Sequence, residues 1–533
     1  MAERVTGGAA VIDALAAHDV RVVFGIPGTH NLEIYRYLPA SGIRHVVTRH
    51  EQGAGYAADG YARVSGRPGV IITTSGPGIT NAITALATAY ADSIPVLAIS
   101  PGPPRGQVRA DVGWLHEVKD QQAALDAVTA RSIRVESADE IPEVLAAVFE
   151  GFATTRPRPV HLEVPVDVLE GEWDRRPTPV RPLPEPVGPG RARAEEIAGL
   201  VDGSHRPLIV AGGGARGAVE EIRALAEYGI RVLTTVNGKG ILDESHPAAL
   251  GAGIRLPAAH RAMDDADLLL VVGSELGDSD LWGGVVRPGE TGRRTVVRVD
   301  LDAAQMHKNV TADVAVVGDA AVVLGDVLSV LREKGFATRT VDPAAQSEIA
   351  ADADADAGPW AEIQRVLREA LPDDTVVAGD SSQVTYYGTV HHWPFTPANR
   401  LLYPTGYATL GYGLPAAIGA KLADRGRPVV AVFGDGAAMF SIQELITATE
   451  QALPIPVVIV DNGGYAEIRE QMVDRGIEPL AVDLYRPDIP ALARAIGAHG
   501  VSATTVEHIG RLAAEALDAD RPTVIHYLVE GTP

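Results

Sequence analysis

Residues Val429 to Tyr465 read VVAVFGDGAAMFSIQELITATEQALPIPVVIVDNGGY, and this stretch decides the fold. An apolar run over 429–433 stops at Gly434-Asp435-Gly436, a helical segment follows, and a second apolar run over 456–460 ends at Asp461-Asn462. The pattern predicts a strand, a helix and a second, parallel strand. We therefore expect Asp435 and Asn462 at neighbouring strand ends, where open α/β sheets bind their ligands.

These two residues offer a carboxylate and an amide oxygen, which are hard ligands suited to Mg²⁺ or Ca²⁺. Gly436, Ala437 and Ala438 open the following helix with unpaired N–H groups, and a helix start beside a divalent ion is a site for a diphosphate. For the Gly-Asp-Gly motif alone, an ordinary strand–helix–strand unit with a tight turn at each strand end is the simpler interpretation.

Composition narrows the class of protein. The 533 residues suffice for about three domains. A composition of 46% hydrophobic and 22% charged residues is typical of a globular protein. A formal net charge of −23 disfavours nucleic acid and anionic membranes as partners. The absence of cysteine excludes disulfides, thiolate catalysis and zinc–thiolate sites. The N-terminus lacks a signal-peptide pattern and no apolar stretch approaches a membrane span, so we expect a cytoplasmic enzyme.

Strand and helix patterns alternate in three blocks, which predicts an α/β protein with parallel sheets. The first domain is expected over 1–173, with a strand over 20–24 and a helix over 79–92, and a proline-rich linker over 174–190 follows it. A central Rossmann-like domain over 191–340 opens with the turn AGGGARG, which could hold a nucleotide or only join a strand to a helix. The acidic, alanine-rich stretch 341–359 is expected to be a mobile linker. The third domain, 360–533, repeats the alternation of strands and helices of the first.

Small residues recur along a predicted helix in the first domain, in the segment RHEQGAGYAADGYAR over 49–63. Their spacing lets another helix or a cofactor approach closely. Glu51 at the start of this helix is, on its own, most simply a partner of the helix dipole.

That segment, together with TTSGPGITNAITALATAYADSIPVLAIS over 73–100, GYGLPAAIGA over 411–420 and the opening stretch, resembles the acetolactate synthase branch of thiamine-diphosphate enzymes. The resemblance covers nearly the whole chain. It implies thiamine diphosphate and Mg²⁺ as cofactors, held by a pyrimidine-binding first domain and a diphosphate-binding third domain. It also implies that Asp435, the side chain of Asn462 and the backbone carbonyl of Gly464 bind the metal.

Further roles follow from the same resemblance. Glu51 stands where the family places the glutamate that bonds N1′ of the aminopyrimidine, and Leu410 matches the apolar residue beneath the cofactor. Gln383 falls where the family contacts the diphosphate, although the neighbouring family histidine is Val384 here. The expected cofactor site is completed by Gly434, Gly436, Ala437 and Tyr465. In the family, Glu51 of one subunit faces Asp435 of another, which implies a homodimer or homotetramer with active sites at the subunit interface.

The family decarboxylates 2-oxo acids and then either releases an aldehyde or condenses the fragment with a second carbonyl. The tryptophan that synthases carry after the metal ligand is absent, with Gln471 near its position. The stretch GSELGDSD over 273–280 replaces the segment used around FAD, so FAD is not expected. His116 stands where synthases carry a glutamine, and it could protonate the intermediate, orient the 2-oxo acid or merely line the crevice.

The segments over 24–38, 114–121 and 464–488 look most similar to 5-guanidino-2-oxopentanoate decarboxylases. A guanidinium requires a carboxylate with bidentate geometry, and Glu467, beside Ile468 on the helix after Asn462, would point toward the reacting end of the cofactor. The alternative is that both are solvent-facing helix charges near Arg469, and this simpler interpretation fits Glu470 better than it fits Glu467. We expect decarboxylation of a 2-oxo acid to an aldehyde and CO₂, with an acetolactate synthase-type carboligase as the alternative.

Overall fold

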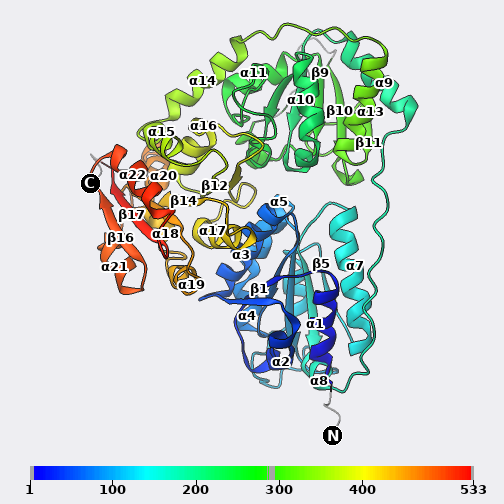
Figure 1. Ribbon diagram of the computed structural model, residues 1–533, viewed down its shortest axis with the longest axis vertical. Coiled ribbons are helices and arrows are strands. Elements are labelled where there is room, and N and C mark those ends of the chain that lie inside the picture. Colours follow the sequence, from blue (N-terminus) through cyan, green and yellow to red (C-terminus); the bar gives the residue numbers. More distant parts are fainter. Residues whose placement is uncertain (1–4, 285, 287–293, 530–533) are drawn as a thin grey trace.

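The computed structural model describes residues 5–284, 286 and 294–529, which form three α/β lobes (Figure 1). The described residues of the first lobe form a parallel sheet in the order β2-β1-β3-β4-β6-β5. Its strands are β1 (Val22–Gly25), β2 (Arg44–Val47), β3 (Gly69–Ile72), β4 (Val96–Gly102), β5 (Arg131–Arg134) and β6 (Val160–Pro165). Its helices are α1 (Gly7–Ala17), α2 (Leu32–Ser41), α3 (Glu51–Ser65), α4 (Pro77–Asn81), α5 (Ile83–Asp92), α6 (Gln121–Asp126), α7 (Ile141–Thr154) and α8 (Val166–Glu170). Because helices cover both faces, strands β3, β4 and β6 are buried along their whole length.

The middle lobe has a parallel sheet in the order β11-β10-β9-β7-β8 within the described residues. Its strands are β7 (Pro207–Ala211), β8 (Arg231–Thr234), β9 (Leu268–Val272), β10 (Thr295–Asp300) and β11 (Val314–Val317). Its helices are α9 (Arg191–Gly203), α10 (Val219–Glu227), α11 (Pro257–Asp264), α12 (Asp278–Leu281) and α13 (Ala320–Glu333). This strand order is that of a doubly wound fold, as expected for a Rossmann-like domain.

The third lobe carries a parallel sheet in the order β13-β12-β14-β15-β17-β16, counted over the described residues. Its strands are β12 (Val376–Ala378), β13 (Arg400–Leu402), β14 (Val429–Gly434), β15 (Pro456–Asp461), β16 (His499–Ala503) and β17 (Thr523–Leu528). Its helices are α15 (Trp360–Ala370), α16 (Val390–His392), α17 (Gly413–Ala423), α18 (Asp435–Ala438), α19 (Glu444–Glu450), α20 (Ala466–Asp474), α21 (Ile489–Ala495) and α22 (Val506–Ala516). Numbered within each lobe, the first and third sheets share one strand order, 2-1-3-4-6-5, which supports an internal duplication of the fold.

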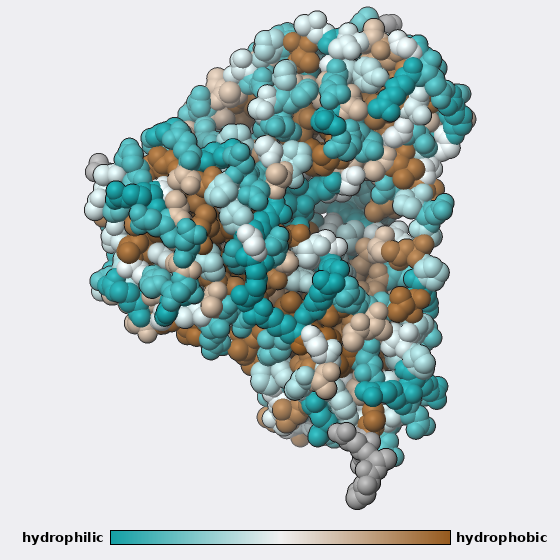
Figure 2. Space-filling view, in the orientation of Figure 1, coloured by the Kyte–Doolittle hydropathy of each residue, from teal (hydrophilic) through white to brown (hydrophobic). Residues whose placement is uncertain are grey.

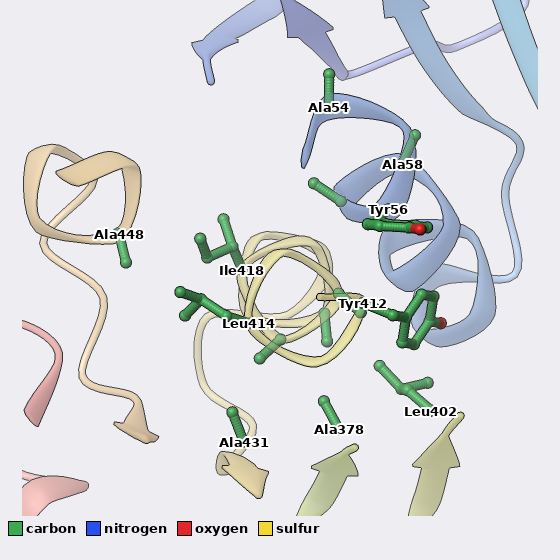
Figure 3. Packing of buried hydrophobic residues seen from close by; sticks show 14 of the residues in the cluster. Ala54, Tyr56, Ala58, Ala378, Leu402, Tyr412, Leu414, Ile418, Ala431 and Ala448 are labelled. Carbon is green, nitrogen blue, oxygen red and sulfur yellow. The ribbon is translucent and has the colours of Figure 1, made fainter. Parts of the chain in front are cut away.

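The first and third lobes pack through helices α3 and α17, which lie side by side (Figure 3). A Cβ on Gly60 would lie 2.2 Å from the carbonyl oxygen of Ala416, and a Cβ on Gly419 would lie 1.9 Å from that of Ala57. Glycine on each helix is therefore required for this close approach. Around the contact, Tyr56 and Tyr412 pack edge to face with ring centroids 5.3 Å apart. The small residues of α3 thus accommodate another helix.

Two predicted segments differ from the structure. The acidic stretch expected to be a mobile linker contains a further helix, α14 (Ala344–Asp356), because Ile349 and Ala353 bury against the middle lobe near α11. The helix predicted over 79–92 is divided into α4 and α5 at Ala82.

The proline-rich stretch 174–190 is extended and exposed for most of its length, and it runs along the outside of the molecule from the first lobe to the middle lobe (Figure 1).

The surface is mostly hydrophilic, with scattered hydrophobic residues, and it is hollowed between the middle and first lobes (Figure 2). Among the described residues, no helix combines the length and apolar character needed to span a bilayer.

Candidate active site

Three neighbouring strands of the third sheet end at one place. Strand β14 pairs with β12 on one side and with β15 on the other, all parallel, so their C-terminal ends share an edge. Asp435 follows β14 as the first residue of α18, and Asn462 follows β15. The helical segment predicted after β14 is divided into the short helices α18 and α19. Ser382, after β12, accepts a hydrogen bond from the Gly434 N–H (3.1 Å) and so ties two strand ends together.

At this edge three acceptor oxygens converge. The amide oxygen of Asn462 lies 3.2 Å from Oδ1 of Asp435 and 3.2 Å from the carbonyl oxygen of Gly464. The amide nitrogen of Asn462 meanwhile faces Oε1 of Gln383 at 3.3 Å. Three acceptors this close repel one another unless the amide rotates to donate to two of them or a cation lies among them. The 3.2 Å spacing fits both solutions: an amide NH₂ that donates to the two oxygens, and three oxygens around a hard cation at about 2.1 to 2.4 Å.

Backbone hydrogen bonds fix the loop around Gly464. The Tyr465 N–H donates to the carbonyl of Val482 (2.9 Å), and the Leu484 N–H donates to that of Gly463 (3.1 Å). Gly463 and Gly464 both have positive φ, at 87° and 140°, and a Cβ on Gly464 would lie 2.1 Å from the Val482 oxygen. Glycine is therefore required for the turn that presents the Gly464 carbonyl to Asp435 and Asn462.

Electrostatics at the site favour a cation. Burial opposes ionisation of Asp461, but hydrogen bonds from His526 (3.0 Å) and the Gly463 N–H (2.9 Å), with Arg486 nearby, outweigh it and lower the pKa of Asp461. Burial, and then the charge of Asp461, raise the pKa of Asp435 to about 6. A positive ion beside Asp435 would relieve both effects.

A cavity of about 640 Å³ opens from this edge between the middle and third lobes. Its described walls include the following residues predicted for the cofactor and substrate sites: Gln383, Leu410, Gly434, Gly436, Ala437, Asn462, Gly464, Tyr465, Glu467 and Ile468. Asp435 adjoins it, since its Oδ1 accepts a hydrogen bond from the Asn462 N–H (3.3 Å). Tertiary folding therefore brings the third-domain part of the predicted site together.

Glu467 faces this cavity rather than bulk solvent and collects four donors. Its Oε2 accepts hydrogen bonds from Tyr386 (3.1 Å), Tyr387 (3.2 Å) and Gln383 (3.2 Å), and its Oε1 accepts one from Gln471 (3.1 Å). Both tyrosines belong to a π-helical segment, Val384–Thr389, a rare conformation often found at functional sites. Burial, and then the Glu467 carboxylate, raise the pKa of both phenols, so both remain O–H donors.

The middle lobe supplies the opposite wall. The guanidinium of Arg255 stacks over the rings of Trp282 and Tyr387, with its Cζ 4.5 Å and 5.2 Å from their centroids, and its Nη1 pairs with Asp356 at 2.9 Å. Trp282 in turn packs against Tyr386, with ring centroids 5.9 Å apart. Asp278 and Asp280 line the same wall, and burial raises the pKa of Asp280 to about 7.

The two predicted catalytic residues lie in the first lobe, away from this cavity. Glu51 is buried at the first turn of α3, where Nδ2 of Asn81 donates to its Oε2 (2.9 Å). His116 lies in the segment between β4 and α6 with a positive φ of 65°. Neither is among the described residues that line the cavity. Within one chain, the structure does not bring Glu51 to Asp435.

Sequence reasoning did not single out Arg255, Trp282, Tyr386 or Tyr387. The tyrosine pair lies three and four residues after Gln383, in the sequence GDSSQVTYY over 379–387, and could have suggested a polar wall. The two middle-lobe residues carry no local signal, because only the packing of one lobe on another places them at the cavity.

The fold and the oxygen set point to an α/β enzyme that holds a diphosphate cofactor at the edges of two duplicated sheets. Three segments match the thiamine pyrophosphate enzyme family: the N-terminal TPP binding domain over 5–124, the central domain over 194–327 and the C-terminal TPP binding domain over 380–527. The chain belongs to this family.

Individual relatives extend over nearly the whole chain. It is 41% identical over 510 residues to a probable 2-ketoarginine decarboxylase, AruI, of Pseudomonas aeruginosa, covering 92% of this chain and 88% of that protein. It is 34% identical to a probable acetolactate synthase large subunit of Methanocaldococcus jannaschii, covering 98% and 92%. It is 32% identical to the acetolactate synthase isozyme 2 large subunit of Escherichia coli, covering 98% and 95%.

Proposed function

We propose that this protein is a thiamine diphosphate- and Mg²⁺-dependent decarboxylase of a 2-oxo acid with a cationic side chain, 2-ketoarginine (5-guanidino-2-oxopentanoate), and that it releases the aldehyde and CO₂. The observation that carries the proposal is the Glu467 carboxylate, which faces the cavity next to the metal-type oxygen set. The 41% identity to a probable 2-ketoarginine decarboxylase supports the same substrate.

The residues present fit the cofactor. Asp435, Asn462 and Gly464 present three oxygens with the spacing and hardness that Mg²⁺ prefers, and the Mg²⁺ would hold the diphosphate against Gly436 and Ala437. Thiamine diphosphate, when bound, supplies the electron sink for the carbon–carbon bond that breaks. The role of this chain's third domain is to bind and orient it, with Leu410 in the cavity wall as the apolar support.

The charge on the cavity wall favours a cationic substrate. Beyond the oxygen set, the described lining carries the carboxylates of Glu467 and Asp278 against one guanidinium, that of Arg255. Asp280, with its pKa raised to about 7, adds a partial negative charge near neutral pH. The Arg255 guanidinium is itself held by aromatic faces and a carboxylate, which are the groups that bind guanidinium ions in proteins. Glu467 therefore offers a second guanidinium the carboxylate it needs, on the opposite wall.

We further propose that the complete site lies between two subunits. The described cavity lacks Glu51, and its third-domain part needs an acid–base partner. Large apolar side chains are exposed beside both half-sites: Leu32, Val112 and Leu115 in the first lobe, and Ile468, Val473, Ile477, Leu480 and Tyr485 in the third. Exposed large apolar side chains that gather near a site are common at subunit interfaces. A symmetric dimer would bring Glu51 of one subunit to Asp435 of the other.

An acetolactate synthase-type carboligase is the second candidate. Relatives named as acetolactate synthases are 32 to 34% identical over 98 to 99% of this chain, and they share the decarboxylation half of the reaction with the leading candidate. The outcomes differ in the acceptor: a proton gives the aldehyde, and a second carbonyl gives the ligation product.

The test is product identification. Purified protein with Mg²⁺ and thiamine diphosphate is incubated with 2-ketoarginine, its neutral analogue 5-ureido-2-oxopentanoate or pyruvate, and products are measured by mass spectrometry. The proposal expects 4-guanidinobutanal and CO₂ from 2-ketoarginine as the fastest reaction. Acetolactate from pyruvate as the main product would replace the leading candidate by the second, and no CO₂ from any substrate would refute both.

The subunit arrangement has its own test. Glu51→Gln and Asp435→Asn proteins are each expected to be inactive, and a re-associated mixture should recover about a quarter of wild-type activity, because each mixed dimer retains one intact site. No recovery after demonstrated subunit exchange would place both residues in one subunit's site.

A further inference from the structure

A second histidine lies beside His116 at the edge of the first sheet. His30 belongs to a short 3-10 helix, Thr29–Asn31, that follows β1, and its Nδ1 lies 2.6 Å from Oγ of Ser75, which follows β3. Its ring stacks on that of Trp114, with centroids 4.4 Å apart and planes at 12°. The ring of His116 lies 5.0 Å away at 72°. Segments after three different strands thus meet around one imidazole.

This cluster is rigidly built. Asn31 clamps the loop below His30, since its Oδ1 accepts from the Gly28 N–H (2.8 Å) and its Nδ2 donates to the carbonyl of Ile26 (3.1 Å). Ser75 is buried, so its hydroxyl has a fixed position. Nδ1 of His116 is buried and has no hydrogen-bond partner among the described residues.

The cluster lies next to Glu51. A Cβ on Gly76 would lie 2.7 Å from the Cβ of His116, and a Cβ on Gly78 would lie 3.4 Å from Oε1 of Glu51. Both groups therefore flank the start of α4, at the C-terminal edge of the first sheet. Parallel α/β sheets bind ligands at this edge. Exposed Leu32, Val112 and Leu115 rim the same region, where the proposed second subunit would cover it.

The proposed reaction requires a proton donor. In R–CO–COO⁻ + H⁺ → R–CHO + CO₂, the bond to the carboxylate breaks, CO₂ leaves, and a C–H bond forms at the carbonyl carbon with a proton from the protein. Ligation of two 2-oxo acids also consumes one proton, but that proton ends on oxygen. A donor placed at the reacting carbon therefore favours the aldehyde.

We propose that His30, oriented by Ser75 and Trp114, is a second acid–base group that acts with His116 on the substrate and directs the reaction to the aldehyde. This inference rests on the proposed function. In it, the imidazolium gives its proton to the carbon whose bond to the carboxylate has broken, where the electron pair of that bond forms the new C–H bond. The neutral imidazole then regains a proton from the solvent. Ser75 is a positioning residue, because its hydroxyl, 2.6 Å from Nδ1, fixes the orientation of the ring.

The turnover test compares His30→Gln with a matched control, His18→Gln. His18 also stacks on an aromatic ring, that of Phe149 (4.5 Å, 10°), but it precedes β1 and so lies at the opposite edge of the sheet. His30→Gln is expected to lower aldehyde release from 2-ketoarginine by about 10- to 100-fold. It should also raise the share of ligation product when pyruvate is added as acceptor. His18→Gln should behave as wild type.

A second readout uses the protein without cofactor or substrate. Burial, and then the charge of His116, lower the pKa of His30. The titratable groups near it are His116 on the same edge and Glu51 across α4. The rate at which diethylpyrocarbonate modifies His30, followed by peptide mass spectrometry against pH, should show a midpoint below that of an ordinary histidine. His116→Gln should move this midpoint upward, and His18→Gln should leave it in place.

The outcomes separate the two proposals. A wild-type enzyme that releases no CO₂ from any 2-oxo acid refutes the proposed function, and this inference with it. An active wild type whose His30→Gln variant matches His18→Gln in rate and product ratio refutes this inference alone. If the modification midpoint of His30 does not respond to His116→Gln, the two imidazoles do not act as a pair.

Discussion

Replacing Glu467 by glutamine isolates one charge at nearly constant shape. Gln471 lies within hydrogen-bond distance of Oε1, and Tyr386, Tyr387 and Gln383 converge on Oε2, an oxygen that glutamine can retain. The substitution removes the negative charge of Glu467, which a guanidinium would contact. A hydrogen bond to a charged group contributes about 1.5 to 3 kcal/mol, and each 1.36 kcal/mol is a factor of ten. We therefore expect kcat/KM for 2-ketoarginine to fall by about 10- to 150-fold.

The assay pairs two substrates of almost equal shape. 2-Ketoarginine carries the guanidinium, and 5-ureido-2-oxopentanoate replaces it by a neutral urea. Aldehyde release is followed with a coupled, NAD-dependent aldehyde dehydrogenase, and binding of thiamine diphosphate is measured separately by calorimetry. For Glu467→Gln, the loss on the neutral substrate should stay within about threefold, since only neutral hydrogen bonds change.

Glu470→Gln is the matched control. Glu470 is one turn further along α20 and exposed, and among the described residues it shares with Glu467 only the donor Gln383, whose Nε2 lies 3.1 Å from it. It should leave the ratio of the two substrates near the wild-type value. Equal losses on both substrates in Glu467→Gln would show that the residue supports the cavity wall and does not recognise a cation.

Three further predictions concern the cofactor and the domain contact. Glu51→Gln should bind thiamine diphosphate with nearly wild-type affinity and lose about 10²- to 10⁴-fold in turnover, the usual contribution of an acid–base group; near-normal turnover would remove its role. Loss of an outer-shell partner typically weakens metal binding by about 10- to 100-fold, and Asp435→Asn, which removes a direct ligand, should weaken Mg²⁺-dependent cofactor binding by more than this. Unchanged binding by calorimetry would contradict the metal site. Glu444, fully buried, accepts hydrogen bonds from the N–H groups of Arg49 and His50 at the start of α3, and burial raises its pKa to about 7 from 4.5. Because its folded-state pKa is raised, its contribution to stability is present below pH 4.5 and lost as the pH rises through 7, a change of about 3 kcal/mol. The melting temperature of Glu444→Gln, measured by calorimetry and taken relative to that of the wild type, should therefore rise between pH 5 and pH 8. A difference that stays constant over this range would contradict this.

The sequence by itself determined the class of fold and the placement of Asp435 and Asn462 at neighbouring strand ends. Apolar runs that end in Gly434-Asp435 and in Asp461-Asn462 specify two strand ends locally, and a right-handed crossover then makes them neighbours. The small residues along the predicted helix over 49–63, Gly60 among them, likewise indicated a close approach of another element, and the structure places Ala416 against Gly60. These features depend on short-range pattern, which a single chain displays directly.

The residues that surround Asp435 and Asn462 could be identified only from the tertiary structure. Arg255 and Trp282 reach the cavity because the middle lobe packs on the third, and Tyr386 meets Glu467 across about eighty residues of chain through a π-helical turn. The acidic stretch around Ile349 became helix α14 because the middle lobe offers it an apolar surface, which its composition does not reveal. Contacts between distant segments depend on the relative placement of whole lobes, and no local pattern encodes that placement.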